Sequence, residues 1–184
     1  MSKMGFIINL ERCIGCNACV IACKSGNSLE PDMHRRTVTQ IDETAFGGVL
    51  RTYRSIACNH CENPACMAIC PQKAYTKDED GVVLHNPDLC IGCEICKTVC
   101  PYEAPCLNPA TKKMSKCDMC YDRRKEGLEP YCVSACPMEA ITIADFDTID
   151  ESKYEKSVPG FPDISLTQPN VRFIVPKSGE QIRQ

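Results

Sequence analysis

The segment that decides the fold is Cys90-Ile91-Gly92-Cys93-Glu94-Ile95-Cys96-Lys97-Thr98-Val99-Cys100-Pro101. Its cysteines follow the spacing C-x-x-C-x-x-C-x-x-x-C. The same spacing occurs near the N-terminus, at Cys13, Cys16, Cys19 and Cys23. Two further groups have longer internal intervals: Cys58, Cys61, Cys66 and Cys70, then Cys117, Cys120, Cys132 and Cys136. With 17 cysteines among 184 residues, cysteine chemistry is expected to dominate the fold.

Disulfides, zinc and iron–sulfur clusters compete to explain so many cysteines. Residues 1–12 contain no apolar stretch long enough for a signal peptide, so export as a disulfide protein is not expected. The odd cysteine total also fits poorly with complete disulfide pairing. Zinc needs only four ligands, usually supplied by two separated C-x-x-C pairs. Three cysteines at successive two-residue intervals favour iron–sulfur clusters, since one short loop can then wrap three corners of a cube.

Glycine and proline mark the turns that such a loop requires. Gly15 and Gly92 lie between the first two cysteines of their groups, where a tight turn tolerates no bulk. Pro71, Pro101 and Pro137 each follow a fourth cysteine, where the fixed φ of proline helps the chain leave the cluster.

The chain also contains an internal repeat. The second and third groups, with the charged turn 76–81 and the β-like residues 82–85 between them, form one continuous two-cluster ferredoxin. If residues 136–143 are written before residues 6–16, the result has the same order of motifs as this unit: a Cys-Pro pair, β-like residues and a Cys-Ile-Gly-Cys run. We therefore predict an α+β fold of two ferredoxin-like units, one inserted into a circularly permuted other. Few short strands and helices and long irregular loops are expected.

The ferredoxin spacing predicts the ligands, because in this run the fourth cysteine binds the neighbouring cluster. Four [4Fe–4S] clusters are expected, bound through these sixteen cysteines: Cys13, Cys16, Cys19 and Cys136 for cluster 1; Cys117, Cys120, Cys132 and Cys23 for cluster 2; Cys58, Cys61, Cys66 and Cys100 for cluster 3; Cys90, Cys93, Cys96 and Cys70 for cluster 4.

The units have the following predicted bounds. Residues 1–48 with 106–144 form the outer unit, residues 49–105 form the inserted unit, and residues 145–184 form an extended C-terminal arm with four prolines. Residues 24–49 are expected to be a polar link with a Gly47-Gly48 turn, leading to a strand over 49–56. The short helices are expected to follow the fourth cysteine of each group. The arm is expected to pack over the units or along a partner.

Composition argues against two classes of partner. The net charge is −3 and the basic residues form no stripe, so nucleic-acid binding has little support. No stretch approaches the roughly 20 apolar residues of a membrane span, so any membrane link is expected to come through a partner. The location stays open between the cytoplasm and the periplasm, the latter by co-export with a partner.

Two motifs carry a family resemblance. They are the Cys-Pro-Tyr-Glu-Ala-Pro run at 100–105 and the Met-Ser-Lys-Cys-Asp-Met-Cys-Tyr-Asp-Arg run at 114–123. With the four cysteine groups, residues 4–145 resemble the iron–sulfur (beta) subunits of DMSO-reductase-family molybdopterin oxidoreductases. The resemblance implies electron transfer, in anaerobic respiration, to or from a large catalytic subunit with a molybdenum or tungsten bis-pterin centre. In many relatives a membrane quinone-interacting anchor subunit is a further partner. We expect no C-terminal membrane helix of the kind found in some relatives, which favours a soluble heterodimer or a separate anchor.

No residue of this chain is expected to be a catalytic acid, base or nucleophile, because substrate chemistry would lie in the partner. An electron-transfer subunit of a hydrogenase and a non-redox structural metal module are the alternative functions. Cys106 is the unassigned thiol, interpreted as a small buried hydrophobe. His60 lies between Cys58 and Cys61. It is interpreted either as an ordinary loop residue or as a residue that tunes the potential of the adjacent cluster. Lys116 and Arg12, each beside a cysteine, are cluster-tuning or surface charges.

Five tyrosines are expected to shield the clusters from water: Tyr53, Tyr75, Tyr102, Tyr121 and Tyr131.

Overall fold

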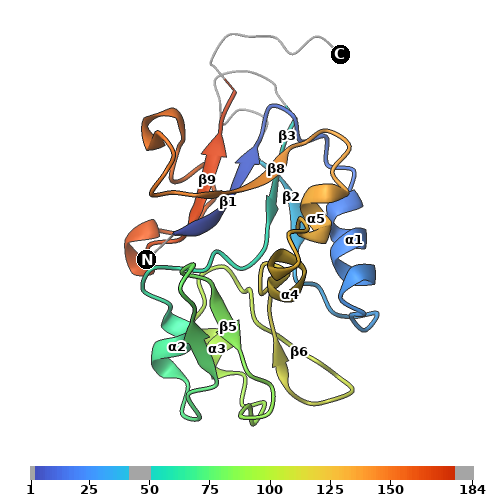
Figure 1. Cartoon of the computed structure of the whole chain (residues 1–184), viewed down its shortest axis with the longest axis vertical. Coiled ribbons are helices and arrows are strands. Elements are labelled where there is room, and N and C mark those ends of the chain that lie inside the picture. Colours follow the sequence, from blue (N-terminus) through green and yellow to red (C-terminus); the bar gives the residue numbers. More distant parts are fainter. Residues whose placement is uncertain (1–2, 42–50, 177–184) are drawn as a thin grey trace.

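Segments near both ends of the described residues pair in the largest sheet, in a computed structural model that describes residues 3–41 and 51–176. Strand β1 (Met4–Asn9) lies at its centre, antiparallel to β8 (Ile141–Asp145) and parallel to β9 (Val171–Ile174). Figure 1 shows these three strands together. The consecutive apolar residues Phe6, Ile7 and Ile8 are all buried, as expected when both faces of a strand are covered.

Three two-stranded sheets complete the β structure of the described residues. Strand β2 (Thr37–Ile41) pairs with β3 (Thr52–Ile56), β4 (Tyr75–Lys77) with β5 (Val83–His85), and β6 (Cys106–Leu107) with β7 (Met114–Ser115), all antiparallel. The β4–β5 turn is closed by Asp78, whose carboxylate accepts the Val82 N–H at 2.7 Å, and by Gly81 at φ 76°. This is the charged turn that the sequence predicts.

The helices are short, but the predicted placement after the fourth cysteine is wrong. Helices α1 (Ala18–Gly26), α2 (Ala65–Ile69), α3 (Ile95–Thr98) and α5 (Tyr131–Ser134) each contain the third cysteine of a group. Helix α4 (Tyr121–Lys125) follows a second cysteine. The physical reason is the four-residue interval between the third and fourth cysteines, which matches one helical turn.

The helices pack in two pairs. Helix α1 packs against α5, and α2 packs against α3. Figure 1 shows the first pair at one side of the molecule and the second pair at its lower end.

The segment expected to be a polar link contains a strand. Strand β2 is formed by Thr-Val-Thr-Gln-Ile, whose β-branched residues favour extended backbone. Strand β3 covers part of the predicted strand 49–56, while the Gly47-Gly48 turn and residues 49–50 lie outside the described residues.

The segment after Asp145 packs on the rest of the chain. It contains the 3₁₀ turns η1 (Glu151–Lys153) and η2 (Ile164–Leu166) before β9. Phe173 of β9 is fully buried, packs edge-on against Phe161 at 5.2 Å, and joins the main core with Phe6 and Ile8. The C-terminal segment therefore covers β1 instead of leaving this edge open.

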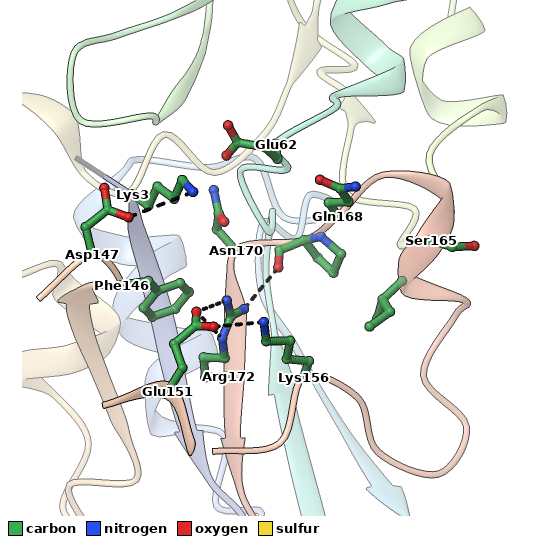
Figure 2. Close-up of a pocket in the computed structure, with 12 residues that line it drawn as sticks. Lys3, Glu62, Phe146, Asp147, Glu151, Lys156, Ser165, Gln168, Asn170 and Arg172 are labelled. Atoms are coloured by element: carbon green, nitrogen blue, oxygen red, sulfur yellow. Dashed lines mark hydrogen bonds and ion pairs between the residues drawn. The ribbon is translucent and has the colours of Figure 1, made fainter. Parts of the chain in front are cut away.

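Arg172 holds this segment in place, as Figure 2 shows. Its guanidinium donates to the Glu151 carboxylate, with Nε at 3.0 Å, and lies 4.3 Å from the Phe146 ring centroid. Lys156 pairs with the same carboxylate at 2.8 Å. The guanidinium is nearly buried while the carboxylate is one-third exposed, so the pair is only partly screened by water.

We expect Glu151→Gln to destabilise the protein by about 1–2 kcal/mol, because a nearly buried guanidinium loses its carboxylate. The apparent melting temperature of the loaded protein should fall by about 2–8 °C. The matched control is Lys153→Gln, which breaks an exposed ion pair with Asp150 and should leave the melting temperature within about 2 °C. Equal melting temperatures for both variants would contradict this role of Arg172.

Candidate metal centres

The predicted ligand cysteines gather around shared cavities. One cavity is lined by four thiols together with Tyr102, Lys116 and Thr167. Its thiols are those of Cys58, Cys61, Cys66 and Cys100. Two of them lie in the loop before α2 and one lies in α2 itself. The fourth comes from the end of the next cysteine group, as the spacing predicts.

Two further cavities repeat this arrangement. One is lined by Cys70, Cys90, Cys93 and Cys96, and the other by Cys13, Cys16, Cys19 and Cys136. The second brings together cysteines from opposite ends of the cysteine-rich region. The antiparallel pairing of β1 with β8 makes this possible, because it places Cys13 and Cys136 just beyond neighbouring strand ends.

The remaining four cysteines are close enough to influence one another electrostatically. Burial, together with the neighbouring Cys132 and Cys120, raises the pKa of Cys23 to about 11. Burial also raises the pKa of Cys117 well above its ordinary value, and again Cys132 and Cys23 add to the effect. Cys23, Cys117, Cys120 and Cys132 thus form a fourth group, with α1 supplying the first and α5 the last.

The chemistry of these sites fits an iron–sulfur core. Burial raises the pKa of Cys61 and of Cys66 to about 12, so four ionised thiols in such a cavity require a compensating positive charge. No three His, Cys, Asp or Glu side chains in residues 3–41 and 51–176 converge closely enough to hold a single metal ion. The thiols surround a space instead of meeting at a point, which suits a multi-iron core bound by four thiolates.

All four groups have a left-handed residue immediately before the second cysteine. These residues are Gly15 (φ 72°), His60 (φ 43°), Gly92 (φ 69°) and Met119 (φ 57°). The turn aims backbone N–H groups at sulfur: Gly92 donates to Cys90 Sγ at 3.4 Å, and Met119 donates to Cys117 Sγ at 3.3 Å. Left-handed backbone is unfavourable for His60 and Met119, and the strain is retained where it shapes a site.

A second recurring turn follows the Cys-Pro pairs. Lys73, Glu103 and Glu139 each lie three residues after a fourth cysteine and have φ between 48° and 51°. The next residue then donates its N–H to the cysteine: Ala74 to Cys70 Sγ at 3.4 Å, and Ala140 to Cys136 Sγ at 3.2 Å. Hydrogen bonds to the sulfurs are among the factors that set cluster potentials.

The two cations considered as cluster-tuning charges, Arg12 and Lys116, have different environments. Arg12 is an exposed residue paired with Glu139 at 3.2 Å, in agreement with a surface charge. Lys116 is only 3% exposed, so the surface interpretation is wrong for it. Its ammonium donates to the carbonyls of Val83 and Cys117 while its side chain lines the Cys58 cavity. A buried cation therefore lies between two cysteine groups.

His60 and Cys106 line none of these cavities. His60 is fully buried, and its Nδ1 accepts the Val83 N–H at 3.1 Å. Burial, with Lys116 and Arg124 nearby, holds the pKa of His60 well below its usual range, so the ring is neutral. Cys106 is half-buried in β6 and donates to the Ser115 carbonyl at 3.4 Å.

The tyrosines differ in their distance from the thiols. Tyr75 and Tyr102 line the cavities of Cys96 and Cys61, and burial raises the pKa of Tyr102 to about 12. Tyr53 packs over Gly15, beside the Cys13 cavity. Tyr131 contacts Gly26 and Arg123, and Tyr121 contacts Lys125.

Comparison with known proteins supports the iron–sulfur interpretation. A family model described as a 4Fe-4S dicluster domain matches residues 49–146, and a 4Fe-4S binding domain matches residues 4–25. The B subunit of anaerobic dimethyl sulfoxide reductase from Haemophilus influenzae is 40% identical, over 93% of this chain and 88% of its own length. The corresponding Escherichia coli subunit is 41% identical, over 92% and 87%. The chain belongs to the iron–sulfur subunits of the DMSO reductase family.

Another relative extends the family to a different sulfur compound. The B subunit of polysulfide reductase from Wolinella succinogenes is 41% identical, over 95% of this chain and 94% of its own length. Membership in this family makes [4Fe–4S] clusters the cofactors of the chain. Among the described residues, no helix has the length and apolar composition needed to cross a bilayer.

We expect Gly92→Ala to lose iron, because a Cβ there would lie 2.1 Å from the Lys112 carbonyl oxygen, in backbone that cannot rotate away. The control is Gly127→Ala, which has the same left-handed backbone (φ 75°) but no atom within 4 Å of the added Cβ. Iron per protein should fall in the first variant and stay at the wild-type value in the second. Equal iron content would show that the close approach at Gly92 is not needed for cluster binding.

Proposed function

We propose that this chain is an electron-transfer subunit that relays electrons through four [4Fe–4S] clusters to or from a molybdopterin catalytic subunit containing molybdenum or tungsten. The observation that carries the proposal is the set of cavities lined by four cysteines, each drawn from two cysteine groups. When bound, each cluster supplies reversible one-electron transfer. The chain contributes the thiolates, the N–H donors to sulfur and a largely buried environment.

The proposed ligand sets follow the exchange of fourth cysteines. Cluster 1 is bound by Cys13, Cys16, Cys19 and Cys136, and cluster 2 by Cys117, Cys120, Cys132 and Cys23. Cluster 3 is bound by Cys58, Cys61, Cys66 and Cys100, and cluster 4 by Cys90, Cys93, Cys96 and Cys70. The cavity linings support sets 1, 3 and 4, and the mutual pKa effects support set 2.

We further propose that the chain is one ferredoxin-like unit (49–105) inserted into a permuted second unit (1–48 with 106–144), followed by the arm (145–184). Two similarities support this division. Strands β1 and β8 pair antiparallel beside helices α1 and α5, and strands β4 and β5 pair antiparallel beside helices α2 and α3. Each unit thus contains an antiparallel strand pair beside a helix pair, together with two cysteine sets.

The cluster order is proposed to be 1–2–3–4. Within a unit, two clusters are linked by cysteines one helical turn apart, whose Cβ atoms lie about 5–6 Å from each other. Cys19 and Cys23 form such a link in α1. Between the units, Cys58 of set 3 influences the pKa of Cys117 of set 2. Lys116 precedes Cys117 and lines the Cys58 cavity, which supports placing sets 2 and 3 side by side.

The two terminal clusters would then be the ones that meet partners. Cys16 of set 1 and Cys93 of set 4 are exposed. Ile14 and Met138 are exposed around the first site. Ile91 and Ile95 are exposed around the second. Apolar side chains gathered at an exposed site are typical of protein–protein contact, and the proposed partners are the catalytic subunit and a membrane quinone-interacting anchor subunit.

The relatives favour this role over a subunit of a hydrogenase. In addition to the dimethyl sulfoxide and polysulfide reductase subunits, a Salmonella typhi protein named thiosulfate reductase electron transfer subunit is 39% identical. Its alignment covers 80% of this chain and 77% of its own length.

We expect Cys23→Ala to disrupt cluster 2 and spare cluster 1, because Cys23 is proposed to bind with Cys117 and not with its neighbours in sequence. Alkylation followed by mass spectrometry should find Cys117, Cys120 and Cys132 newly reactive, with iron content lowered. The control is Cys106→Ala, which should keep all iron. New reactivity at Cys13, Cys16 and Cys19 instead would contradict the ligand exchange.

We expect the tagged chain, purified from its native cells without oxygen, to bring with it a large subunit containing a pterin and molybdenum or tungsten. Metal analysis and mass spectrometry of the complex give the result. Nickel with no pterin would favour the hydrogenase alternative. Full iron content without reversible reduction would contradict electron transfer and favour a structural metal module.

A further inference from the structure

A buried arginine lies between two of the cysteine sets. Arg36, just before β2, is only 1% exposed. The groups that act on its charge are thiols: Cys132, Cys117 and Cys23 of set 2, and Cys19 of set 1. Burial lowers the pKa of Arg36, but the four thiols together raise it by more, so the guanidinium stays charged.

The described residues give this cation little compensation. Its Nη1 donates to the Ser55 carbonyl at 3.3 Å and to Ser55 Oγ at 3.1 Å. Its Nε and Nη2 have no hydrogen-bond partner, and no carboxylate of residues 3–41 or 51–176 forms an ion pair with it. A fully buried charge without a counter-charge is strongly unfavourable. The compensation must therefore come from the cysteine sites that surround it.

A hydrogen-bonded chain connects the guanidinium to one of these sites. Ser55 Oγ accepts from Arg36 and lies 3.4 Å from Cys19 Sγ. Because Nη1 occupies the hydroxyl oxygen as a donor, the hydroxyl proton is free to point at the sulfur. Phe6 stacks on the guanidinium at 4.5 Å and closes the site from the β1 side. The position of Arg36 is thus fixed from β1 and β3 together.

We propose that Arg36 is the shared counter-ion of clusters 1 and 2 and raises the reduction potentials of both. The inference rests on the proposed function and ligand sets. A cluster bound by four thiolates is negatively charged and gains one more negative charge on reduction. A fixed buried cation therefore stabilises the reduced form more than the oxidised form. Net charge and hydrogen bonds to sulfur are factors that set such potentials.

The two clusters are expected to respond differently to their contacts with Arg36. Three of the four proposed ligands of cluster 2 are among the thiols that interact electrostatically with Arg36. The guanidinium charge therefore acts on cluster 2 directly. Cluster 1 feels the charge through Cys19 and also through the Ser55 hydroxyl. Clusters 3 and 4 have no ligand in this set, so their potentials should not depend on Arg36.

The test is a reductive titration of the full chain, purified without oxygen and followed by electron paramagnetic resonance. In Arg36→Gln, two of the four one-electron components should move to lower potential. We expect the reduction equilibrium of each to change about tenfold, which is 59 mV for a one-electron couple. Arg36→Lys keeps the charge and should restore most of the loss.

The matched control is Arg54→Gln. Arg54 is a neighbouring, partly buried arginine, adjacent to Ser55 in the chain and 5.6 Å from the ring centroid of Phe161, but burial alone shifts its pKa and no thiol contributes. All four components should keep their potentials in this variant. If Arg54→Gln shifts the same two components, the effect is structural and the proposal is wrong.

If Arg36→Gln loses iron, the same titration is carried out on Ser55→Ala, which keeps the cation and removes the hydroxyl next to Cys19. One component should then fall in potential, and no change would overturn the proposal. Four unmoved components in an iron-loaded Arg36→Gln protein would also overturn it. Fewer than four one-electron components in the wild-type chain would instead contradict the proposed function.

Discussion

The structure depends on one electrostatic constraint: most of its cysteine sulfurs are buried enough that ionising them without a neighbouring positive charge is unfavourable. Burial raises the pKa of most of these thiols, and for Cys23, Cys61 and Cys66 to about 11 or 12. Iron provides the main compensation where four thiolates bind a cluster. Backbone N–H groups aimed at sulfur provide more, and the buried cations Arg36 and Lys116 lie where sites adjoin.

The same constraint explains why so little regular structure is needed. Helices α1, α2, α3 and α5 are one or two turns long, and each carries a third cysteine close to a fourth. Since those two cysteines belong to different proposed clusters, a helix also sets the spacing of neighbouring clusters. The left-handed turns at Gly15, Gly92 and their counterparts supply the remaining geometry. The apolar core around Phe6, Ile8 and Phe173 closes the molecule around these sites.

The cysteine pattern is informative about the metal sites because ligand spacing is a local property. Three thiols within seven residues must lie on one loop, so their grouping could be inferred without a fold. The predicted exchange of fourth cysteines agrees with the cavity linings at Cys100, Cys70 and Cys136. Sequence reasoning missed Arg36, which belongs to a segment interpreted as a polar link. A charged residue just before a β-branched strand was the only signal, and charge by itself does not indicate burial.

The sequence by itself determined the number and type of clusters, the turns at the ligand loops, the charged turn 76–81 with the β-like segment after it, and the family, because each depends on residue type and short spacing. Tertiary structure alone decided which charges are buried. Lys116 lies beneath β5 and Arg12 lies in water, although both are adjacent to a cysteine. It also decided that the C-terminal segment adds β9 to the sheet. Burial and parallel pairing both depend on contacts between residues far apart in the chain, and short-range patterns carry no information about those contacts.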